Sequence, residues 1–238
     1  MCCRNVKKMA EKEKIRELFD SIAPTYDHLN HLLSLNIDKR WRKKAVRQLD
    51  KATVKKMLDV ACGTGDFAIK ACQHGIPEIH GIDISNNMLA VGNKKIASLG
   101  MHDKIRLQQG DGENIGFPND TFDAVTIAFG IRNFEHLDKG LREMNRVLKN
   151  NGKVVILEFS MPRSFPMKQV YSFYFKRILP TIGGFLSKNK QAYQYLPASV
   201  AIFPQGNVFL QIMRECGFRD AACKKLTFGI ACIYTGTK

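Results

Sequence analysis

The spacing of apolar positions predicts two helices in the first fifty residues. Apolar side chains recur at i, i+3, i+4 and i+7, the spacing of one helix face, and these are Ile15, Leu18, Phe19 and Ile22. Pro24 ends this pattern, because a proline cannot continue a helix. A second helical pattern follows at about residues 40–46. We therefore expect residues 1–50 to form a helical segment that precedes the main domain.

From residue 56 onward, short apolar runs alternate with helical patterns. The runs have the length of buried strands and lie at residues 56–61, 79–84, 105–109, 122–128 and 153–159. Helices are expected between them. One ends near Gly75, and one begins at Ser85, a suitable N-cap, and continues to Leu99. The last is closed by Asn151-Gly152 and carries the apolar positions Leu137, Leu141, Met144 and Leu148.

The end of the chain adds a helical insertion and two further strands. The insertion is expected at about residues 165–195, and the strands at 221–225 and 230–235 look like a closing hairpin. Strands that alternate with helices form a parallel sheet covered on both faces. We therefore predict an α/β fold with a doubly wound, seven-stranded sheet, in which residues 51–238 form the main domain.

The most informative motif follows the first expected strand. It reads Leu-Asp-Val-Ala-Cys-Gly-Thr-Gly-Asp over residues 58–66 and leads into a helix. Gly63 and Gly65 can adopt positive φ and let a ligand approach the backbone, and the helix N-terminus offers free N–H groups. Such turns bind NAD, FAD or S-adenosylmethionine (SAM). Asp59 favours SAM, because a carboxylate would repel a pyrophosphate and attract the ammonium group of SAM.

Two further strand ends carry polar groups suited to a nucleoside. Asp83 follows Asp59 at about the spacing of 20 residues that suits hydrogen bonds to ribose hydroxyls, although it could instead cap the next helix. Asp111 can accept from an adenine amino group while Gly112 leaves room for the ring, although a solvated turn is the alternative. The three strand ends together predict a SAM site. An NAD-dependent dehydrogenase is less suited, since its fingerprint usually has a third glycine where this chain has Ala68.

The chain has an unusual excess of positive charge. Its 37 Lys and Arg residues against 22 Asp and Glu residues give a net charge of +15. Nucleic acid, an anionic membrane surface or acidic ligands would each suit this charge, and so would solubility alone. DNA and RNA amino-methyltransferases usually carry an Asn/Asp-Pro-Pro-Tyr/Phe run after the fourth strand, whereas residues 128–133 read Ala-Phe-Gly-Ile-Arg-Asn. We therefore expect no nucleic-acid partner.

The cysteines and the N-terminus indicate the cellular location. The seven cysteines form no CxxC pair and have no histidine at metal-ligand spacing. The N-terminus lacks the apolar region of a signal peptide, and no apolar run reaches the ~20 residues that span a bilayer. We expect reduced thiols, no metal site and a cytoplasmic protein.

The chain resembles the UbiE/MenG family of quinone-biosynthesis C-methyltransferases over nearly its whole length. The most specific shared segments are Ala-Pro-Thr-Tyr-Asp-His-Leu-Asn at residues 23–30 and Phe-Gly-Ile-Arg-Asn at 129–133. The resemblance implies a class I SAM-dependent methyltransferase, Rossmann-like with a C-terminal antiparallel hairpin. It also implies SAM contacts from Thr64, Asp83, Asp111 and Gly112. Two positions depart from the pattern, because Ala128 stands where some relatives have serine and Phe228 where many have glycine.

The reaction implied by the family is methyl transfer to a ring carbon of a prenylated hydroquinone. Ionising the ortho hydroxyl would push electron density onto that carbon. The substrate-side segment 1–50 and the fourth strand end would supply the catalytic residues Tyr26, Arg132 and Asn133, with Asp27 and His136 as alternatives. Arg132 would stabilise a phenolate or orient a water, because a guanidinium cannot act as a base. Demethylmenaquinol is the expected acceptor, and ubiquinone precursors or other lipophilic phenols are the alternatives.

A lipophilic acceptor also needs a route from the membrane. The insertion carries apolar and aromatic residues beside basic ones, which suits a lid that dips into an anionic bilayer; packing as core under a cap is the alternative. We therefore consider peripheral contact with the inner face of the cell membrane. A homo-oligomer is considered separately. The apolar positions are Val170, Tyr171, Phe173, Tyr174, Phe175, Ile178 and Leu179, and the basic ones are Lys168, Lys176 and Arg177.

Overall fold

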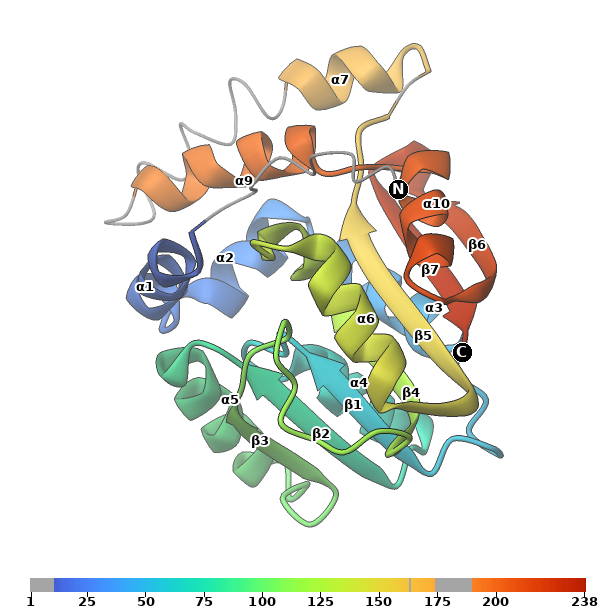
Figure 1. Cartoon of the computed structure of the whole chain (residues 1–238). Helices are drawn as coiled ribbons and strands as arrows, with labels where there is room; N and C mark the ends of the chain where they lie inside the picture. The colour runs from blue at the N-terminus through green and yellow to red at the C-terminus, as the bar shows by residue number, and fades with distance from the viewer. Residues whose placement is uncertain (1–10, 163, 174–189) are drawn as a thin grey trace.

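Seven strands form a single mixed sheet (Figure 1). They are β1 (Lys56–Val60), β2 (Glu78–Asp83), β3 (Ile105–Gln109), β4 (Phe122–Ala128), β5 (Leu148–Phe159), β6 (Arg219–Leu226) and β7 (Ala231–Thr237). The order across the sheet is β3-β2-β1-β4-β5-β7-β6. The first five strands run parallel to one another, whereas β7 pairs antiparallel with both β5 and β6. The computed structural model describes residues 11–162, 164–173 and 190–238.

Helices cover both faces of the sheet and also lie over the carboxyl ends of its parallel strands (Figure 1). They are α1 (Lys12–Ile22), α2 (Tyr26–Leu33), α3 (Ile37–Val46), α4 (Asp66–His74), α5 (Asn86–Ser98), α6 (Leu137–Val147), α7 (Met167–Phe173), α9 (Lys190–Ile202) and α10 (Asn207–Glu215), with short 3-10 turns η1 (Ile131–Asn133) and η3 (Thr227–Gly229). Within the described residues, none of the helices has both the length and the apolar composition needed to cross a bilayer.

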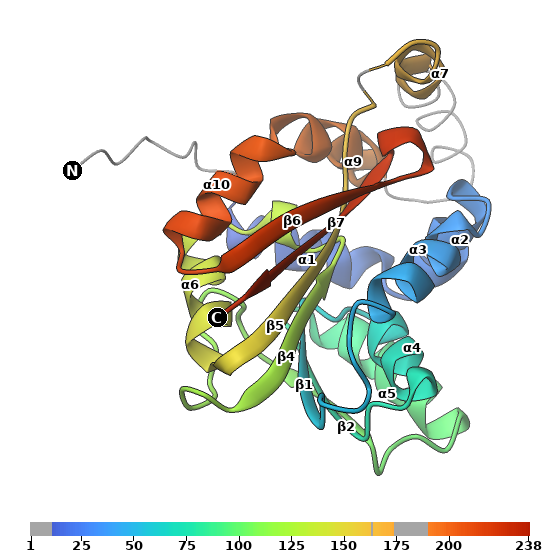
Figure 2. The same cartoon turned by 90° about the vertical axis from the view of Figure 1, so that its right-hand side faces the viewer.

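Two apolar cores lie on opposite faces of the sheet. Figure 2 shows α6 and α10 on one side and α3 and α4 on the other. Leu141 of α6 and Phe209 of α10 are fully buried on the first side, and Ala45 of α3 and Ala68 of α4 on the second. Because both faces are covered, β4 and the second half of β5 are apolar at most positions, and the exceptions are Asp123, Thr126 and Glu158.

The predicted sheet and its closing hairpin are confirmed. β3 and β4 have the predicted bounds, and Ser85 caps α5 by accepting a hydrogen bond from the backbone N–H of Met88 at 3.1 Å. The first predicted helix is α1, and the pattern near residue 40 is α3. Helices α2 and α10 were not predicted. Parts of the predicted insertion form α7 and the start of α9, while residues 174–189, with six of the lid positions, lie outside the described residues.

One predicted boundary is wrong. The helix expected to continue through Leu148 to Asn151-Gly152 ends at Val147, and Leu148 begins β5. Leu148 has extended backbone angles (φ −71°, ψ 139°) and pairs with Phe122 of β4. Its side chain is buried in the core. The last residue of a helix and the first residue of a strand can both be apolar and buried, so apolar spacing alone could not separate them.

The N-terminal helices are attached to the sheet domain by side-chain hydrogen bonds. Asp20 of α1 accepts from the Ser85 hydroxyl at 2.6 Å and from the Asn87 backbone N–H at 3.2 Å. Trp41 of α3 donates its indole N–H to the Thr227 hydroxyl at 2.8 Å, which links α3 to the tip of the β6–β7 hairpin. Helices α1 and α2 therefore lie over the carboxyl ends of the parallel strands (Figure 1).

The ring of Phe134 is held between two glycines. A Cβ atom added at Gly112 would lie 2.5 Å from the Phe134 Cζ, and one added at Gly140 would lie 2.2 Å from its Cδ2. Both distances are far shorter than any real carbon contact. Gly112 and Gly140 therefore leave room for a ring that seals the space between α6 and the loop after β3.

This packing predicts that Gly140→Ala destabilises the fold. Alanine is the better helix former by up to about 1 kcal/mol, but overpacking costs about 1–3 kcal/mol, so the clash with Phe134 outweighs the propensity gain. The melting temperature should fall by about 2–4 °C for each kcal/mol lost. Gly116→Ala is the control, because its Cβ would have no neighbour within 4 Å. Equal melting temperatures for the two variants would contradict the packing.

Candidate active site

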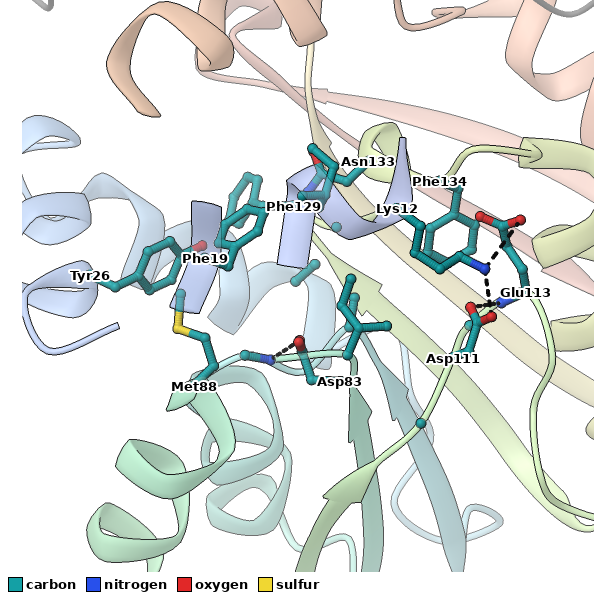
Figure 3. Close-up of a pocket in the computed structure, with 18 residues that line it drawn as sticks. Lys12, Phe19, Tyr26, Asp83, Met88, Asp111, Glu113, Phe129, Asn133 and Phe134 are labelled. Atoms are coloured by element: carbon teal, nitrogen blue, oxygen red, sulfur yellow. Dashed lines mark hydrogen bonds and ion pairs between the residues drawn. The ribbon is translucent and has the colours of Figure 1, made fainter. Parts of the chain in front are cut away.

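A cavity of about 670 Å³ opens at the carboxyl ends of the parallel strands (Figure 3). Its walls come from the segments that follow β1, β2, β3 and β4 and from helices α1 and α2. Doubly wound sheets bind ligands in this position. Six of the predicted site residues line it, namely Gly63, Asp83, Asp111 and Gly112 from the cofactor set and Tyr26 and Asn133 from the catalytic set.

The glycine turn and the end of β2 are joined at the floor of this cavity. The backbone N–H of Gly63 donates to Asp83 Oδ2 at 2.8 Å, and Ser85 N–H donates to Asp83 Oδ1 at 2.9 Å. Burial raises the pKa of Asp83, although these backbone donors oppose the shift. Gly63 has φ +54°, and a Cβ there would meet no atom within 4 Å, so this part of the turn faces open space. A ribose could approach both groups without displacing protein atoms.

The end of β3 carries a cluster of charged side chains. Asp111 Oδ2 accepts from Lys12 Nζ at 2.6 Å, and Asp111 Oδ1 accepts from the Glu113 N–H at 2.9 Å. Glu113 is itself buried and accepts from the Glu135 N–H at 2.8 Å. Figure 3 shows Lys12 reaching down from α1 toward both carboxylates. Each Asp111 oxygen keeps a lone pair for a further donor such as an adenine amino group.

Three predicted cofactor residues lie beside the cavity and do not line it. Thr64 is buried, and its hydroxyl lies 2.5 Å from Asp27 Oδ1. Lys95 Nζ donates to Asp27 Oδ2 at 2.6 Å, so the turn is tied to both α2 and α5. Gly65 precedes α4 with φ +77°, a conformation that glycine adopts most readily. Asp59 is the third.

Asp59 is a carboxylate buried beneath the turn. It is 1% exposed, and its Oδ1 accepts from the Thr126 hydroxyl at 2.7 Å. Its Oδ2 has no hydrogen-bond partner among the described residues. Burial raises the pKa of Asp59 to about 7, while the bond from Thr126 and the charge of Arg42 act in the opposite direction. A buried carboxylate oxygen that lacks a donor lowers the stability of the fold, and a cationic ligand group nearby would reduce this loss.

A second cavity of about 780 Å³ adjoins the first and shares Phe19, Tyr26 and Phe129 with it. The rings of Phe129 and Phe159 lie with centroids 4.5 Å apart and an interplanar angle of 32°. Burial raises the pKa of Tyr26, while Arg132 and Arg42 oppose the shift from nearby. The second cavity therefore combines aromatic surfaces with two guanidinium groups.

Arg132 is buried at the boundary between η1, β5 and α9. Its Nη1 lies 2.8 Å from Glu158 Oε1 and also donates to the Phe129 carbonyl, and its Nε donates to the Ser199 hydroxyl at 3.2 Å. Glu158 is fully buried, which raises its pKa, and Arg132 opposes that shift. The neighbouring Asn133 accepts from the Tyr195 hydroxyl at 2.9 Å. The predicted catalytic residues Arg132 and Asn133 are thus held by α9.

A second buried ion pair lies on α3 and also lines the second cavity. Arg42 pairs with Asp38, which also accepts from the Ser34 hydroxyl at 2.6 Å and lies 2.9 Å from His31 Nδ1. The Arg42 guanidinium lies 5.3 Å from the centre of the Phe129 ring. The second cavity is therefore lined by two arginines, and each of them is paired with a carboxylate.

A histidine and two aspartates near α4 also lie close enough to one another to suggest a metal site. Ligand atoms of His31, Asp38 and Asp66 all lie within 4.8 Å of one another. However, Arg42 pairs with Asp38, and Lys95 Nζ lies 2.7 Å from Asp66 Oδ1. Since these two cations already balance the carboxylates, we describe the cluster as a hydrogen-bonded ion network.

Several residues of the two cavities were not predicted. Lys12, Asp38 and Arg42 belong to amphipathic helices, where charged residues are usually solvated, so the sequence offered no signal for them. Glu158 did offer one. A carboxylate inside the otherwise apolar strand Val-Val-Ile-Leu-Glu-Phe needs a buried partner, and that partner is Arg132.

Comparison with known proteins places the chain in a family. The model of the ubiE/COQ5 methyltransferase family matches residues 7–238. A demethylmenaquinone methyltransferase from Bacteroides fragilis is 48% identical over 96% of this chain and 94% of its own length. A ubiquinone/menaquinone biosynthesis C-methyltransferase UbiE from Geobacter sulfurreducens is 49% identical over 97% of this chain and 91% of its own length.

Solved structures with low sequence identity share the fold. A SAM-dependent methyltransferase from Thermotoga maritima has a TM-score of 0.66 at 18% identity, over 93% of this chain and 99% of its own. Phosphoethanolamine N-methyltransferase 2 of Haemonchus contortus, solved with SAM, has a TM-score of 0.58 at 18% identity, over 78% of this chain and 49% of its own. The predicted class I fold, SAM cofactor and methyltransferase activity are confirmed. The chain belongs to the ubiE/COQ5 methyltransferase family.

Proposed function

We propose that the protein methylates a ring carbon of a prenylated hydroquinone, with SAM in the first cavity and the hydroquinone ring in the second. The observation that carries this proposal is the adjacency of the two cavities, which share Phe19, Tyr26 and Phe129. A methyl group held beside these shared residues would be accessible from both cavities. Such a juxtaposition provides the alignment that an in-line transfer requires.

In the first cavity, SAM would supply an electrophilic methyl group. We assign the ribose hydroxyls to Asp83, the adenine amino group to Asp111, and the close backbone approach to Gly63. Gly112 lines this cavity and would lie beside the adenine ring, while its missing Cβ leaves room for Phe134. Asp59, Thr64 and Gly65 would act from beneath, with Asp59 providing a negative charge below the ammonium group and the other two fixing the turn.

In the second cavity, a flat aromatic acceptor would lie against Phe129 and Phe159. Arg132 would donate to one ring oxygen and hold the acceptor ring in place as its hydroxyl loses a proton. Glu158 keeps the guanidinium in one orientation and balances its charge. Tyr26 and Asn133 line the first cavity, so they would orient the methyl donor against the ring carbon.

The relatives' names support menaquinone-type acceptors. The proteins from Bacteroides fragilis and Porphyromonas gingivalis, 48% and 41% identical, are both demethylmenaquinone methyltransferases. The Geobacter sulfurreducens relative is named for both ubiquinone and menaquinone biosynthesis. Demethylmenaquinol is therefore the acceptor we propose, and a ubiquinone precursor is the second candidate.

We expect methyl-labelled SAM to label demethylmenaquinol faster than a demethylated ubiquinone precursor of equal tail length. Product extracted into organic solvent and separated by chromatography gives the rate for each. Asp83→Ala is the control, because it removes the assigned ribose contact and should abolish labelling of both. Label in neither quinol, with SAM still bound by the wild-type protein, would refute the proposed acceptor class.

A membrane-facing surface would give a prenylated acceptor its route to the cavity. The α7 region exposes three large apolar side chains, with Phe165 82%, Val170 56% and Phe173 62% exposed. Lys168 lies on the same helix, and the chain carries a net charge of +15. We propose that this α7 surface (Phe165, Val170 and Phe173) contacts an anionic bilayer. Tyr171 is instead buried, which agrees with the alternative prediction that these aromatic residues pack as core.

Replacing Phe165 and Phe173 by serine should weaken binding to anionic vesicles. Burying one phenylalanine contributes about 1.5–3 kcal/mol, so loss of both should weaken partitioning at least about 100-fold. Co-sedimentation with phosphatidylglycerol vesicles at low salt measures this. Leu99→Ser is the control, because Leu99 is 48% exposed and follows α5 at the opposite end of the molecule. Equal sedimentation of all variants would refute the α7 surface as the contact.

Asp59→Asn should separate the stability of the protein from its affinity for SAM. The raised pKa of about 7 means that the folded protein binds this proton more tightly than the unfolded chain does. The stabilising contribution is complete below about pH 4 and is lost as the pH rises to about 7, on the order of 4 kcal/mol. The ligand-free variant should match the wild type at pH 4 and be more stable than it at pH 8.

Urea unfolding at both pH values and calorimetric SAM titration at pH 8 provide the measurements. SAM affinity should fall in Asp59→Asn, because the charge below the ammonium group is gone. Asp103→Asn, which alters an exposed carboxylate, is the control and should change neither quantity. A variant with the wild-type dependence of stability on pH would contradict the raised pKa of Asp59.

A further inference from the structure

We propose that Asp38 is the catalytic residue that accepts the hydroxyl proton of the aromatic acceptor, and that His31 positions Asp38 and takes the proton onward. This inference rests on the proposed function, because it concerns the acceptor in the second cavity. It gives a role to an ion pair on α3 that the cofactor site does not use.

The proton needs an acceptor in the second cavity, and the cavity wall offers few. Its ionisable side chains among the described residues are Tyr26, Asp38, Arg42, Arg132 and Tyr195. The two guanidinium groups carry no lone pair that can take a proton. Burial raises the pKa of both tyrosines, which keeps their own protons in place. Asp38 is the remaining group, and it is a carboxylate.

Asp38 is held in a state that can accept. Burial acts to raise the pKa of Asp38, but hydrogen bonds and charges from Ser34, Arg42 and His31 outweigh it and leave the pKa below its usual range. The carboxylate is therefore ionised. Its Oδ2 is shared by Arg42 and His31, whereas its Oδ1 accepts only from the Ser34 hydroxyl at 2.6 Å among the described hydrogen bonds. Oδ1 thus retains a lone pair for a donor in the cavity.

A weakly basic carboxylate suffices because the hydroxyl becomes acidic during the reaction. A phenolic hydroxyl has an ordinary pKa of about 10, too high for a carboxylate to ionise it beforehand. As the ring carbon forms its bond to the methyl carbon, the oxygen takes on the character of a protonated carbonyl, a far stronger acid. Proton transfer to Asp38 during bond formation is then favourable.

The atoms and electrons balance over one turnover. A bond forms between ring carbon and methyl carbon, the sulfur–methyl bond breaks with its electron pair left on sulfur, and the hydroxyl proton moves to Asp38. Aromaticity returns when the hydrogen left on the methylated carbon moves as a proton to the ring oxygen. One proton therefore leaves the site per turnover, and it is the one held by Asp38.

The ion network behind Asp38 offers this proton a route out. In the tautomer that carries its proton on Nε2, His31 accepts the proton of Asp38 at Nδ1 and passes its own Nε2 proton to Asp66. His31 Nδ1 lies 2.9 Å from Asp38 Oδ2, and His31 Nε2 lies 3.6 Å from Asp66 Oδ2. The side chain of Asp66 is 22% exposed, so the chain of groups reaches solvent. Two cations face it, Arg42 from α3 and Lys95 from α5, and Arg42 lies 3.7 Å from Asp66. Asp27 of α2 is the other charged neighbour, through Lys95.

The test compares Asp38→Asn and His31→Gln with the wild type in methyl transfer to demethylmenaquinol. General-base catalysis contributes about 10²–10⁴-fold, so kcat for Asp38→Asn should fall by about 10²-fold or more. His31→Gln, which keeps the Asp38–Arg42 pair, should show a smaller fall. SAM affinity by calorimetry should stay within about threefold in both, because neither residue lines the first cavity. The KM for the quinol should also stay within about threefold, because the amide of Asp38→Asn can still accept a hydrogen bond from the hydroxyl and the proton moves only during bond formation.

Chemical rescue separates proton transfer from charge balance. Asp38→Gly leaves room for an added carboxylate, and acetate and fluoroacetate have nearly the same size but differ in basicity. Proton transfer in the rate-limiting step makes rescue by acetate faster, whereas mere pairing with Arg42 makes the two equal. Equal rescue, or full kcat in Asp38→Asn, overturns the proposal.

The remaining outcomes are also decisive. Should Asp38→Gly fail to fold, a fall of kcat in both Asp38→Asn and His31→Gln at unchanged KM supports the proposal, and wild-type kcat in either overturns it. If the wild-type protein methylates no quinol, the proposed function fails and the role of Asp38 fails with it. Transfer by the wild type with undiminished variants refutes the role of Asp38 alone.

Discussion

The structure around the second cavity depends on the buried pair of Arg132 and Glu158. A fully buried carboxylate without a partner would be strongly destabilising, and so would a guanidinium that is 5% exposed. Together they satisfy each other and fix three elements. Glu158 belongs to β5, Arg132 to η1 after β4, and Ser199, which accepts from Arg132, to α9. Removing either charge would release α9 and η1 together.

The N-terminal helices complete both cavities, so binding and the position of α1 and α2 are linked. Phe19 and Tyr26 form part of both walls. The contacts that hold these helices to the strand ends include those of Lys12 with Asp111, Asp20 with Ser85, and Asp27 with Thr64. The first and last of these reach residues of the predicted cofactor set. A ligand at the glycine turn therefore also acts on the helices that close the acceptor cavity.

The sequence predicted the sheet, its closing hairpin and the strand-end groups Gly63, Asp83 and Asp111, because these depend on local periodicity and on spacing along one motif. It could not predict which charged residues of α1 and α3 turn inward. Asp38 and Lys12 look like solvated helix residues, and only the packing of α1–α3 against distant strands reveals their partners. Asp59 shows the same limit, since the motif predicted a cofactor residue and the structure shows it buried beneath the turn.

The charge balance of the second cavity restricts what it can bind. Arg42 and Arg132 could each attract an anion, but Asp38 and Glu158 already neutralise them. A phosphate or carboxylate ligand would have to compete with these buried partners and would meet their repulsion. A neutral aromatic ring meets no such obstacle, because Phe129 and Phe159 offer it apolar surface. The same pairs still present N–H donors and one carboxylate lone pair to its oxygens. The cavity therefore suits a neutral hydroquinone that acquires charge only as it reacts.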